Sequence, residues 1–380
     1  MPDFTELQHY AFPKWNPSMT SEEIAKQFAT EGTIGEIKMH GGGHINDSYH
    51  LVNTTANQPD YLLQRVNHYV FKDVDLLMRN MSIVTEHISD IVAQRDPAGL
   101  SRRSLRIIPT ITGRTYYKDP DGNFWRLLNF IKDHVVFEST RDPVLAYEGA
   151  RMFGNFTSML SSLNASELGD TIPRFHDLRW RLSQLKESIK ENAAGRLHLV
   201  NEEIRYVESS SELMLTVQEL GEKGAIPLRI AHHDTKISNV LFDLDHKGLC
   251  VIDLDTVMPG YVHSDFGDGI RTFTNTGEED DEILENISLD LELFESFASG
   301  FLESTRKVLN QTEIDTLVYG GLLLPFMQGV RFLTDYIAGD VYYKIKHKEH
   351  NLVRTRAQFK LTQDGEAKLE KMQEIIKKLA

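Results

Sequence analysis

The fold can be argued most directly from one stretch of sequence, Ala231-His232-His233-Asp234-Thr235-Lys236-Ile237-Ser238-Asn239. In it, a His-x-Asp triplet is followed by four residues and then by Asn239. Phosphoryl transfer to a hydroxyl needs a carboxylate at the attacking oxygen and an oxygen ligand for the metal that bridges the phosphates. An Asp and an Asn on one loop can supply both. The same spacing also arises by chance, and Asp234 could simply cap a helix.

A second acidic stretch follows this loop. Residues 239–243 and 249–255 are predicted to form two strands joined by a turn. Since alternate residues of a strand share a face, Asp253 and Asp255 would project together, away from the core. Adjacent carboxylates repel unless a cation compensates, and Mg²⁺ is a hard cation that prefers oxygen ligands. The alternative interpretation is a solvated edge strand.

The order of the remaining elements is informative. Strands are predicted at 34–39, 49–52, 61–63, 106–111 and 124–131, and helices at the Thr20 capping box and over 78–93. Beyond Pro143 the pattern is helical, apart from a β island at 239–257. This order resembles the protein-kinase-like fold, an α+β fold with two lobes.

That resemblance divides the chain at a hinge near Leu128 to Lys132. Residues 1–131 would form a β-rich nucleotide-binding lobe, and residues 132–380 a mainly helical lobe with the catalytic loop and the substrate site. Asn129 and Ile131, in the hinge, are expected to contact the nucleotide.

Composition excludes several classes of protein. The chain has 380 residues, 41% hydrophobic and 26% charged, which suits a soluble globular protein with two lobes. The net charge of −15 disfavours nucleic acid and anionic membranes as partners. The single Cys250 excludes an internal disulfide and fits a reducing compartment. Residues 1–10 resemble no signal peptide, and no run approaches roughly 18 apolar residues. We therefore expect a cytoplasmic protein, whose oligomeric state stays open.

His232, Asp234 and Asn239, followed by Ile252-Asp253-Leu254-Asp255, resemble the catalytic and metal-binding loops of the aminoglycoside phosphotransferase, choline kinase and homoserine kinase superfamily. Within this superfamily the chain most resembles the N-acetylhexosamine 1-kinases. The segments that carry this resemblance are 41–47, 61–68, 257–260, 265–268, 331–336 and 339–345.

The resemblance implies a kinase that uses ATP and Mg²⁺. Asp234 would be the base facing a sugar hydroxyl, the anomeric one of an N-acetylhexosamine, while Asn239 and Asp253 would be ligands of Mg²⁺. Arg331 and Tyr342 match the sugar-site residues of the family. Alternatively, Arg331 pairs with Asp335, one helical turn along the chain.

The sequence departs from the kinase pattern at one position. Kinases of this fold place a Lys on the third strand to hold the phosphates, and here that position is Gln64. Glu86, the candidate for the acid that normally pairs with this Lys, therefore has no Lys at position 64 to pair with. Gly41, Gly42 and Gly43 lack the G-x-G-x-x-G spacing, but their place between two strands favours a phosphate-covering loop.

Three other functions remain open at this point. The acceptor of the phosphoryl group could be another sugar, homoserine, choline or an aminoglycoside. The missing Lys allows a pseudokinase, which binds without catalysis. Asp253 and Asp255 could instead be the paired carboxylates of a glycoside hydrolase, although this leaves Asn239 and the glycines unexplained.

Overall fold

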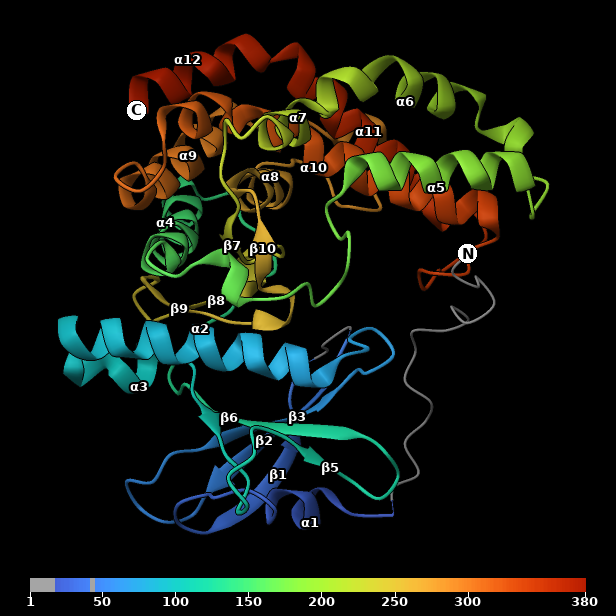
Figure 1. Cartoon of the computed structure of the whole chain (residues 1–380). Helices are drawn as coiled ribbons and strands as arrows, with labels where there is room; N and C mark the ends of the chain where they lie inside the picture. Colours follow the sequence, from blue (N-terminus) through green and yellow to red (C-terminus); the bar gives the residue numbers. More distant parts are fainter. Residues whose placement is uncertain (1–17, 42–44) are drawn as a thin grey trace. The chain divides into compact units, whose positions relative to one another are not determined.

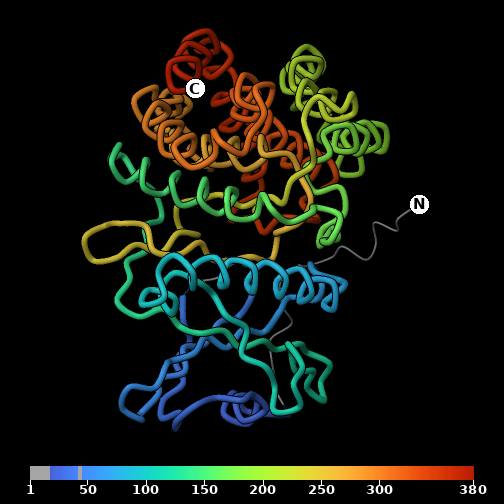
Figure 2. The backbone as a smooth tube through the Cα atoms, turned by 60° about the vertical axis from the view of Figure 1, so that its left-hand side comes forward, coloured from blue at the N-terminus to red at the C-terminus, as the bar shows by residue number. Residues whose placement is uncertain are grey.

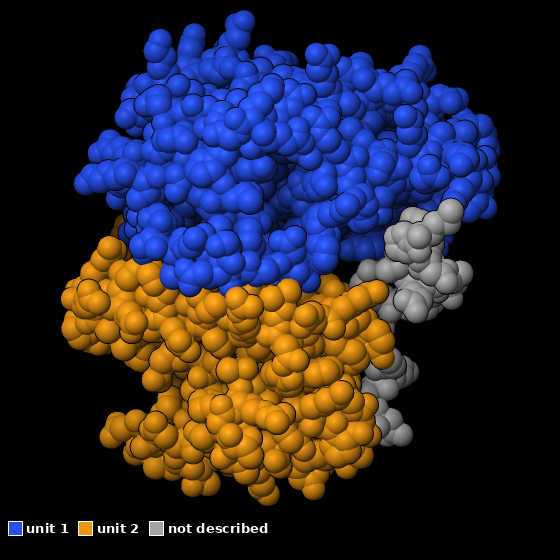
Figure 3. Space-filling model, viewed as in Figure 1, with its two compact units in different colours: residues 1–9, 136–240, 258–380 blue, residues 10–135, 241–257 orange. Residues whose placement is uncertain are grey.

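The computed structural model describes residues 18–41 and 45–380, which divide into two compact units (Figure 3). We call one the β unit, which holds the described residues up to Val135 together with residues 241–257. The other, the helical unit, holds residues 136–240 and 258–380. The first change of unit lies close to the predicted boundary at 131. Segment 241–257, expected in the second lobe, groups with the β unit because Phe242 and Val135 exchange two backbone hydrogen bonds of 2.8 and 3.0 Å.

An antiparallel sheet forms the centre of the β unit. Its order is β1-β2-β3-β6-β4, with β5 added to β6. The strands are β1 Ile34–Met39, β2 Asp47–Asn53, β3 Tyr61–Val66, β4 Ile107–Ile108, β5 Tyr117–Lys118 and β6 Phe124–Asn129. All were predicted except β5, whose two residues are too short for a periodic signal.

The two faces of this sheet differ in polarity because successive residues of a strand point to opposite sides. One face contributes the apolar residues Tyr61, Leu63, Trp125 and Leu127 to a core shared with helix α1, Ser21–Ala25. The other face carries Ser48, Gln64 and Arg126 in one row across β2, β3 and β6. Helix α2, Val74–Arg95, lies along this unit's sheet in both views (Figures 1 and 2), and its Met81 sulfur is 3.5 Å from Arg126 Nη1.

A short hairpin and one small helix complete the β unit. Helix α3 covers Leu100–Arg103, and the hairpin consists of β8 Val240–Phe242, whose first residue is counted with the helical unit, and β9 Gly248–Val251. The predicted second strand of the hairpin was wrong beyond Val251. Asp253 has a left-handed backbone, with φ 61° and ψ 62°, and a 3-10 turn, Leu254–Thr256, follows it. Asp253 and Asp255 therefore do not share a strand face.

The helical unit consists of nine α-helices and a two-stranded sheet in its described residues. The helices are α4 Pro143–Leu160, α5 Leu178–Glu191, α6 Asn201–Met214, α7 Thr216–Glu222, α8 Val262–Phe273, α9 Leu291–Thr305, α10 Gln311–Ala338, α11 His350–Ala367 and α12 Leu369–Leu379. Strands β7 Arg229–Ala231 and β10 Met258–Gly260 pair antiparallel.

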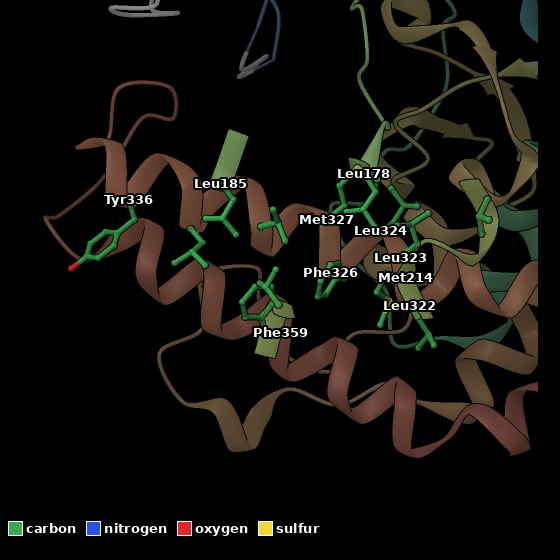
Figure 4. Close-up of a cluster of buried hydrophobic side chains, with 14 of the residues drawn as sticks. Leu178, Leu185, Met214, Leu322, Leu323, Leu324, Phe326, Met327, Tyr336 and Phe359 are labelled. Carbon is green, nitrogen blue, oxygen red and sulfur yellow. The ribbon is translucent and has the colours of Figure 1, made fainter. Parts of the chain in front are cut away.

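Helix α10 is the core of this unit. Figure 4 shows five of its apolar side chains packed with Leu178 and Leu185 of α5, Met214 of α6 and Phe359 of α11. The five are Leu322, Leu323, Leu324, Phe326 and Met327. By length and composition α10 could cross a membrane, but 78% of its most apolar window is buried inside the protein. Its apolar composition is therefore explained by its place in the core.

Two glycines allow α8 to approach α10 closely. A Cβ on Gly267 would lie 2.1 Å from the carbonyl oxygen of Gly320, and one on Gly320 would lie 2.3 Å from that of His263. Any side chain at either position would push the two helices apart. This contact fixes α8 on the core helix, and α8 in turn holds the loop that contains Asp234.

Candidate active site

Two carboxylates of α8 hold the backbone of the loop that contains Asp234. Asp265 accepts hydrogen bonds from the backbone N–H groups of His232 and His233, both at 2.8 Å. Asp268 accepts one from the N–H of Thr235, also at 2.8 Å. Burial raises the pKa of Asp265 to about 6, against the opposing effect of these hydrogen bonds and of His232. The loop is thus anchored to α8 on both sides of Asp234.

His232 also holds the loop, through contacts with α4. Its buried ring makes edge contacts with Phe153 and Phe156 of α4, with ring centroids 5.5 Å apart in each pair. Its Nδ1 accepts a hydrogen bond of 3.3 Å from the backbone N–H of Asp234. Such an acceptor needs an unprotonated Nδ1. These contacts suit the scaffold role that the family resemblance implies for His232.

The Asp234 side chain is partly accessible and ionised. It is 28% exposed, and its Oδ2 lies 3.0 Å from Lys236 Nζ and 2.8 Å from Asn239 Nδ2. Burial opposes its charge, but Lys236, His232 and Asn239 together outweigh burial and hold the pKa of Asp234 below its usual value. At neutral pH this carboxylate can therefore accept a hydrogen bond or a proton from a bound hydroxyl.

Asn239 is oriented by the same loop. Its Nδ2 donates both to the side chain and to the backbone oxygen of Asp234, each at 2.8 Å. With both amide hydrogens used inside the loop, Oδ1 is the atom that can ligate a cation. The donor is a neutral oxygen, of the kind that Mg²⁺ accepts.

Asp253 and Asp255, in the β unit, have different environments. Asp253 is exposed, whereas Asp255 is only 3% exposed. Asp255 forms a short ion pair with Arg126 Nη1 and accepts a 2.6 Å hydrogen bond from Asn46 Nδ2. The predicted pair of outward carboxylates was wrong, because the left-handed turn at Asp253 sends the next acid inward. Of the two, only Asp253 offers an exposed carboxylate for a metal.

The predicted nucleotide contacts lie in the β unit. Gly41 is exposed, with φ +69° and open space where a Cβ would be, and Gly42 and Gly43 fall outside the described residues. Gln64 is half-buried in the polar row of the sheet and bonds to Ser48 and Arg126. Glu86 is exposed on α2.

The hinge residues contribute little side-chain surface. Asn129 is buried, and its amide bonds to the backbone of Ser101, Ser104 and Arg106 at 3.3, 3.1 and 2.6 Å. Ile131 is 3% exposed, and its carbonyl oxygen lies 2.5 Å from His134 Nδ1. A nucleotide contact from these two residues would therefore have to use backbone atoms.

Arg331 and Tyr342 lie on α10 and on the turn after it. Gly339 ends α10 with φ 102°, and Asp335 then accepts hydrogen bonds from the backbone N–H groups of Tyr342 and Tyr343, at 2.8 and 2.9 Å. No ion pair joins Asp335 to Arg331 in residues 18–41 and 45–380. The alternative interpretation, in which these two side chains pair, was wrong because Asp335 is committed to the turn.

Arg331 belongs to a half-buried polar and aromatic surface that we call the arginine wall. The wall consists of Phe175, His176, Arg181, Gln328, Arg331, Tyr342 and Tyr343. The guanidinium carbon of Arg331 lies 5.2 Å from the ring centre of Phe175 and 5.7 Å from that of Tyr343. Its Nη1 donates to Gln328 Oε1 at 3.0 Å.

Arg181 and His176 were not predicted. Burial, followed by repulsion from Arg331, lowers the pKa of Arg181 to about 10. Burial also places the pKa of His176 well below its usual value, with smaller effects of His233, Arg331 and Arg181. His176 Nδ1 is 3.1 Å from His233 Nδ1. Within the helical unit, the wall therefore adjoins the loop of Asp234.

Comparisons with known proteins agree with this architecture. A family described as the phosphotransferase enzyme family matches residues 36–295. An aminoglycoside phosphotransferase from Alicyclobacillus acidocaldarius is structurally similar, with a TM-score of 0.63 and 13% identity over 96% of this chain and 98% of that one. A choline kinase from Cryptosporidium parvum has a TM-score of 0.53 and 15% identity over 90% and 92%. An amicoumacin kinase bound to AMP-PNP and Ca²⁺ has a TM-score of 0.52 and 11% identity over 93% and 91%. The predicted two-lobed fold is confirmed.

The different environments of the two acids predict different effects of their removal. Asp255→Ala leaves the buried guanidinium of Arg126 without its counter-charge, so we expect the free energy of unfolding to fall by about 3–5 kcal/mol. Asp253→Ala, at an exposed position, should change it by less than about 1 kcal/mol. Urea unfolding of both variants measures this. Equal stability of the two variants would contradict the buried ion pair.

Proposed function

Because the chain belongs to the phosphotransferase enzyme family and is thus a small-molecule kinase, we propose that it transfers the γ-phosphoryl group of ATP to a sugar hydroxyl. The acceptor that we propose is the anomeric hydroxyl of an N-acetylhexosamine. The observation that carries this proposal is the arginine wall beside the loop of Asp234, whose two guanidinium groups form no ion pair with a carboxylate in the part of the chain that the structure describes.

In this proposal each residue of the loop has a separate task. The ionised Asp234 accepts the hydrogen bond of the acceptor hydroxyl and takes its proton as the bond to phosphorus forms. Lys236, 3.0 Å from Asp234, keeps that carboxylate ionised. The backbone bonds to Asp265 and Asp268 hold the loop still during the transfer, so that orientation is not lost.

Asn239 and Asp253 are the proposed ligands of Mg²⁺. Both offer hard oxygen atoms, and the exposed carboxylate of Asp253 and the oriented Oδ1 of Asn239 fit this cation chemically. When bound, the ion would neutralise charge on the phosphates.

The positive charge of the arginine wall disfavours cationic acceptors. Choline and aminoglycosides are cations, and a cation beside Arg181 and Arg331 would be repelled by both. The ring faces of Phe175 and Tyr343 that could hold a quaternary ammonium group already face Arg331. A neutral sugar suits the wall better, since its hydroxyl and acetamido oxygens accept hydrogen bonds from guanidinium and tyrosine donors.

Two other functions receive less support. A glycoside hydrolase needs two accessible carboxylates, and Asp255 is buried against Arg126. A pseudokinase is favoured by Gln64 alone, whereas Asp234, Asn239 and Asp253 are all present. Measurement of turnover decides between a pseudokinase and a kinase.

A coupled assay of ADP release tests the proposal. With ATP and Mg²⁺ present, we expect turnover with N-acetylhexosamines, weaker turnover with hexoses that lack the acetamido group, and none with choline or aminoglycosides. The control is Asp234→Asn, which should lose about 10²–10⁴-fold or more in kcat and keep its affinity for ATP. ADP release with choline but with no sugar would contradict the proposed acceptor. A variant that keeps over a tenth of the activity would contradict the role of Asp234.

Arg331→Ala tests the sugar site. Loss of its donors should raise KM for the sugar, leave KM for ATP nearly unchanged and remove roughly 2–4 kcal/mol of transition-state stabilisation. Steady-state kinetics with each substrate varied in turn measure this, and Arg205→Ala, at an exposed arginine of α6, is the matched control. If Arg331→Ala lowers the melting temperature and leaves both KM values unchanged, the arginine is structural and the sugar site lies elsewhere.

A further inference from the structure

A buried polar network connects four segments of the β unit. Arg126 of β6 is 1% exposed, and its Nη1 contacts Asp255, two residues after the proposed metal ligand Asp253. Asp255 also accepts from Asn46, which lies a few residues after the glycine run. The Nε of Arg126 donates to Gln64 Oε1 at 3.0 Å. The network therefore ends on the side chain that occupies the lysine position of β3.

Arg126 determines which way the amide of Gln64 points. A guanidinium has only donors, so the oxygen of the amide must face Arg126, and the NH₂ group must face the other way. Nε2 does so, and donates to Ser48 Oγ at 2.9 Å. Its second hydrogen has no protein acceptor among the residues that the structure describes. Gln64 is half-buried, so this hydrogen can reach a ligand at the surface of the sheet.

The same geometry explains why position 64 is not a lysine. Gln64 and Arg126 are directly opposite each other in the β3–β6 register. A lysine at position 64 would therefore face a cation on the neighbouring strand, and like charges directly opposite are destabilising. The arginine of β3 itself, Arg65, pairs with Asp47 and lies in the opposite pleat direction.

We propose that Gln64 is the donor that binds the α- and β-phosphates of ATP, and that Arg126 is the positioning residue that orients it. The proposal rests on the function proposed above. Asp255 takes the part of the acid that normally pairs with a lysine of β3, while Glu86 on α2 stays exposed. The cation, Arg126, thus lies on β6 and its acid, Asp255, in the 3-10 turn after β9, and the neutral amide of Gln64 makes the phosphate contact.

Gln64→Glu is the sharpest test. Glutamate has the same shape and can still accept from Arg126, so the fold should be kept, but it cannot donate to a phosphate at neutral pH. We expect the affinity for Mg·ATP, measured by titration calorimetry, to fall about tenfold or more, since hydrogen bonds to charged groups are among the strong ones. The affinity for adenosine, which has no phosphate, should stay unchanged.

Arg126→Lys tests the orienting role separately. Lysine keeps a positive charge for Asp255 but has no fork to reach Gln64 at the same time, so we expect a three- to tenfold loss for Mg·ATP and none for adenosine. If Gln64→Glu leaves the ratio of Mg·ATP to adenosine affinity at its wild-type value, the phosphate contact is overturned. If Gln64→Glu lowers this affinity ratio and Arg126→Lys leaves it at its wild-type value, the positioning role of Arg126 is overturned. A wild-type protein that binds no nucleotide overturns the proposed function and this inference together.

Discussion

Hydrogen bonds from the backbone of residues 232–235 to the buried carboxylates of Asp265 and Asp268 determine the shape of the candidate catalytic loop. Buried carboxylates are unfavourable unless they are bonded, and here the backbone N–H groups of the loop donate hydrogen bonds to them. Asp268 is further neutralised by Arg271. Because the side chains of Asp234 and Asn239 project from this loop, their orientation depends on bonds made by α8.

The position of α8 depends in turn on the core helix. The glycine contact between α8 and α10 leaves no room for a side chain, and α10 is buried along most of its length. The same helix carries Arg331 and ends at Gly339, where Asp335 holds the turn with Tyr342 and Tyr343. One helix thus supports the loop of Asp234, through α8, and carries Gln328 and Arg331 of the arginine wall. In the proposed function, this common support keeps Asp234 and Arg331 at the same acceptor.

The sequence allowed the fold and part of the candidate site to be predicted. Local signals sufficed where the chemistry is local, as in the Asp234 loop, the capping box at Thr20 and the strands of the sheet. Periodicity failed at Asp253, because a left-handed turn reverses the faces that a strand would give. The position of Asn129 in the sequence also did not indicate that its side-chain amide is hydrogen-bonded to backbone groups of residues 101–106.

Residues such as His176, Arg181 and Arg126 could not be found from the sequence. Each interacts with a residue far along the chain, namely His233, Arg331 and Asp255 respectively, and no short sequence motif indicates such pairs.

The central claim, transfer of phosphate from ATP to the anomeric oxygen of an N-acetylhexosamine, is tested most directly by ³¹P NMR of the reaction product. The account predicts a new phosphate ester whose phosphorus couples to the anomeric proton. A phosphorus coupled to the methylene protons of the sugar, or a spectrum with inorganic phosphate as the only new signal apart from ADP, would contradict it.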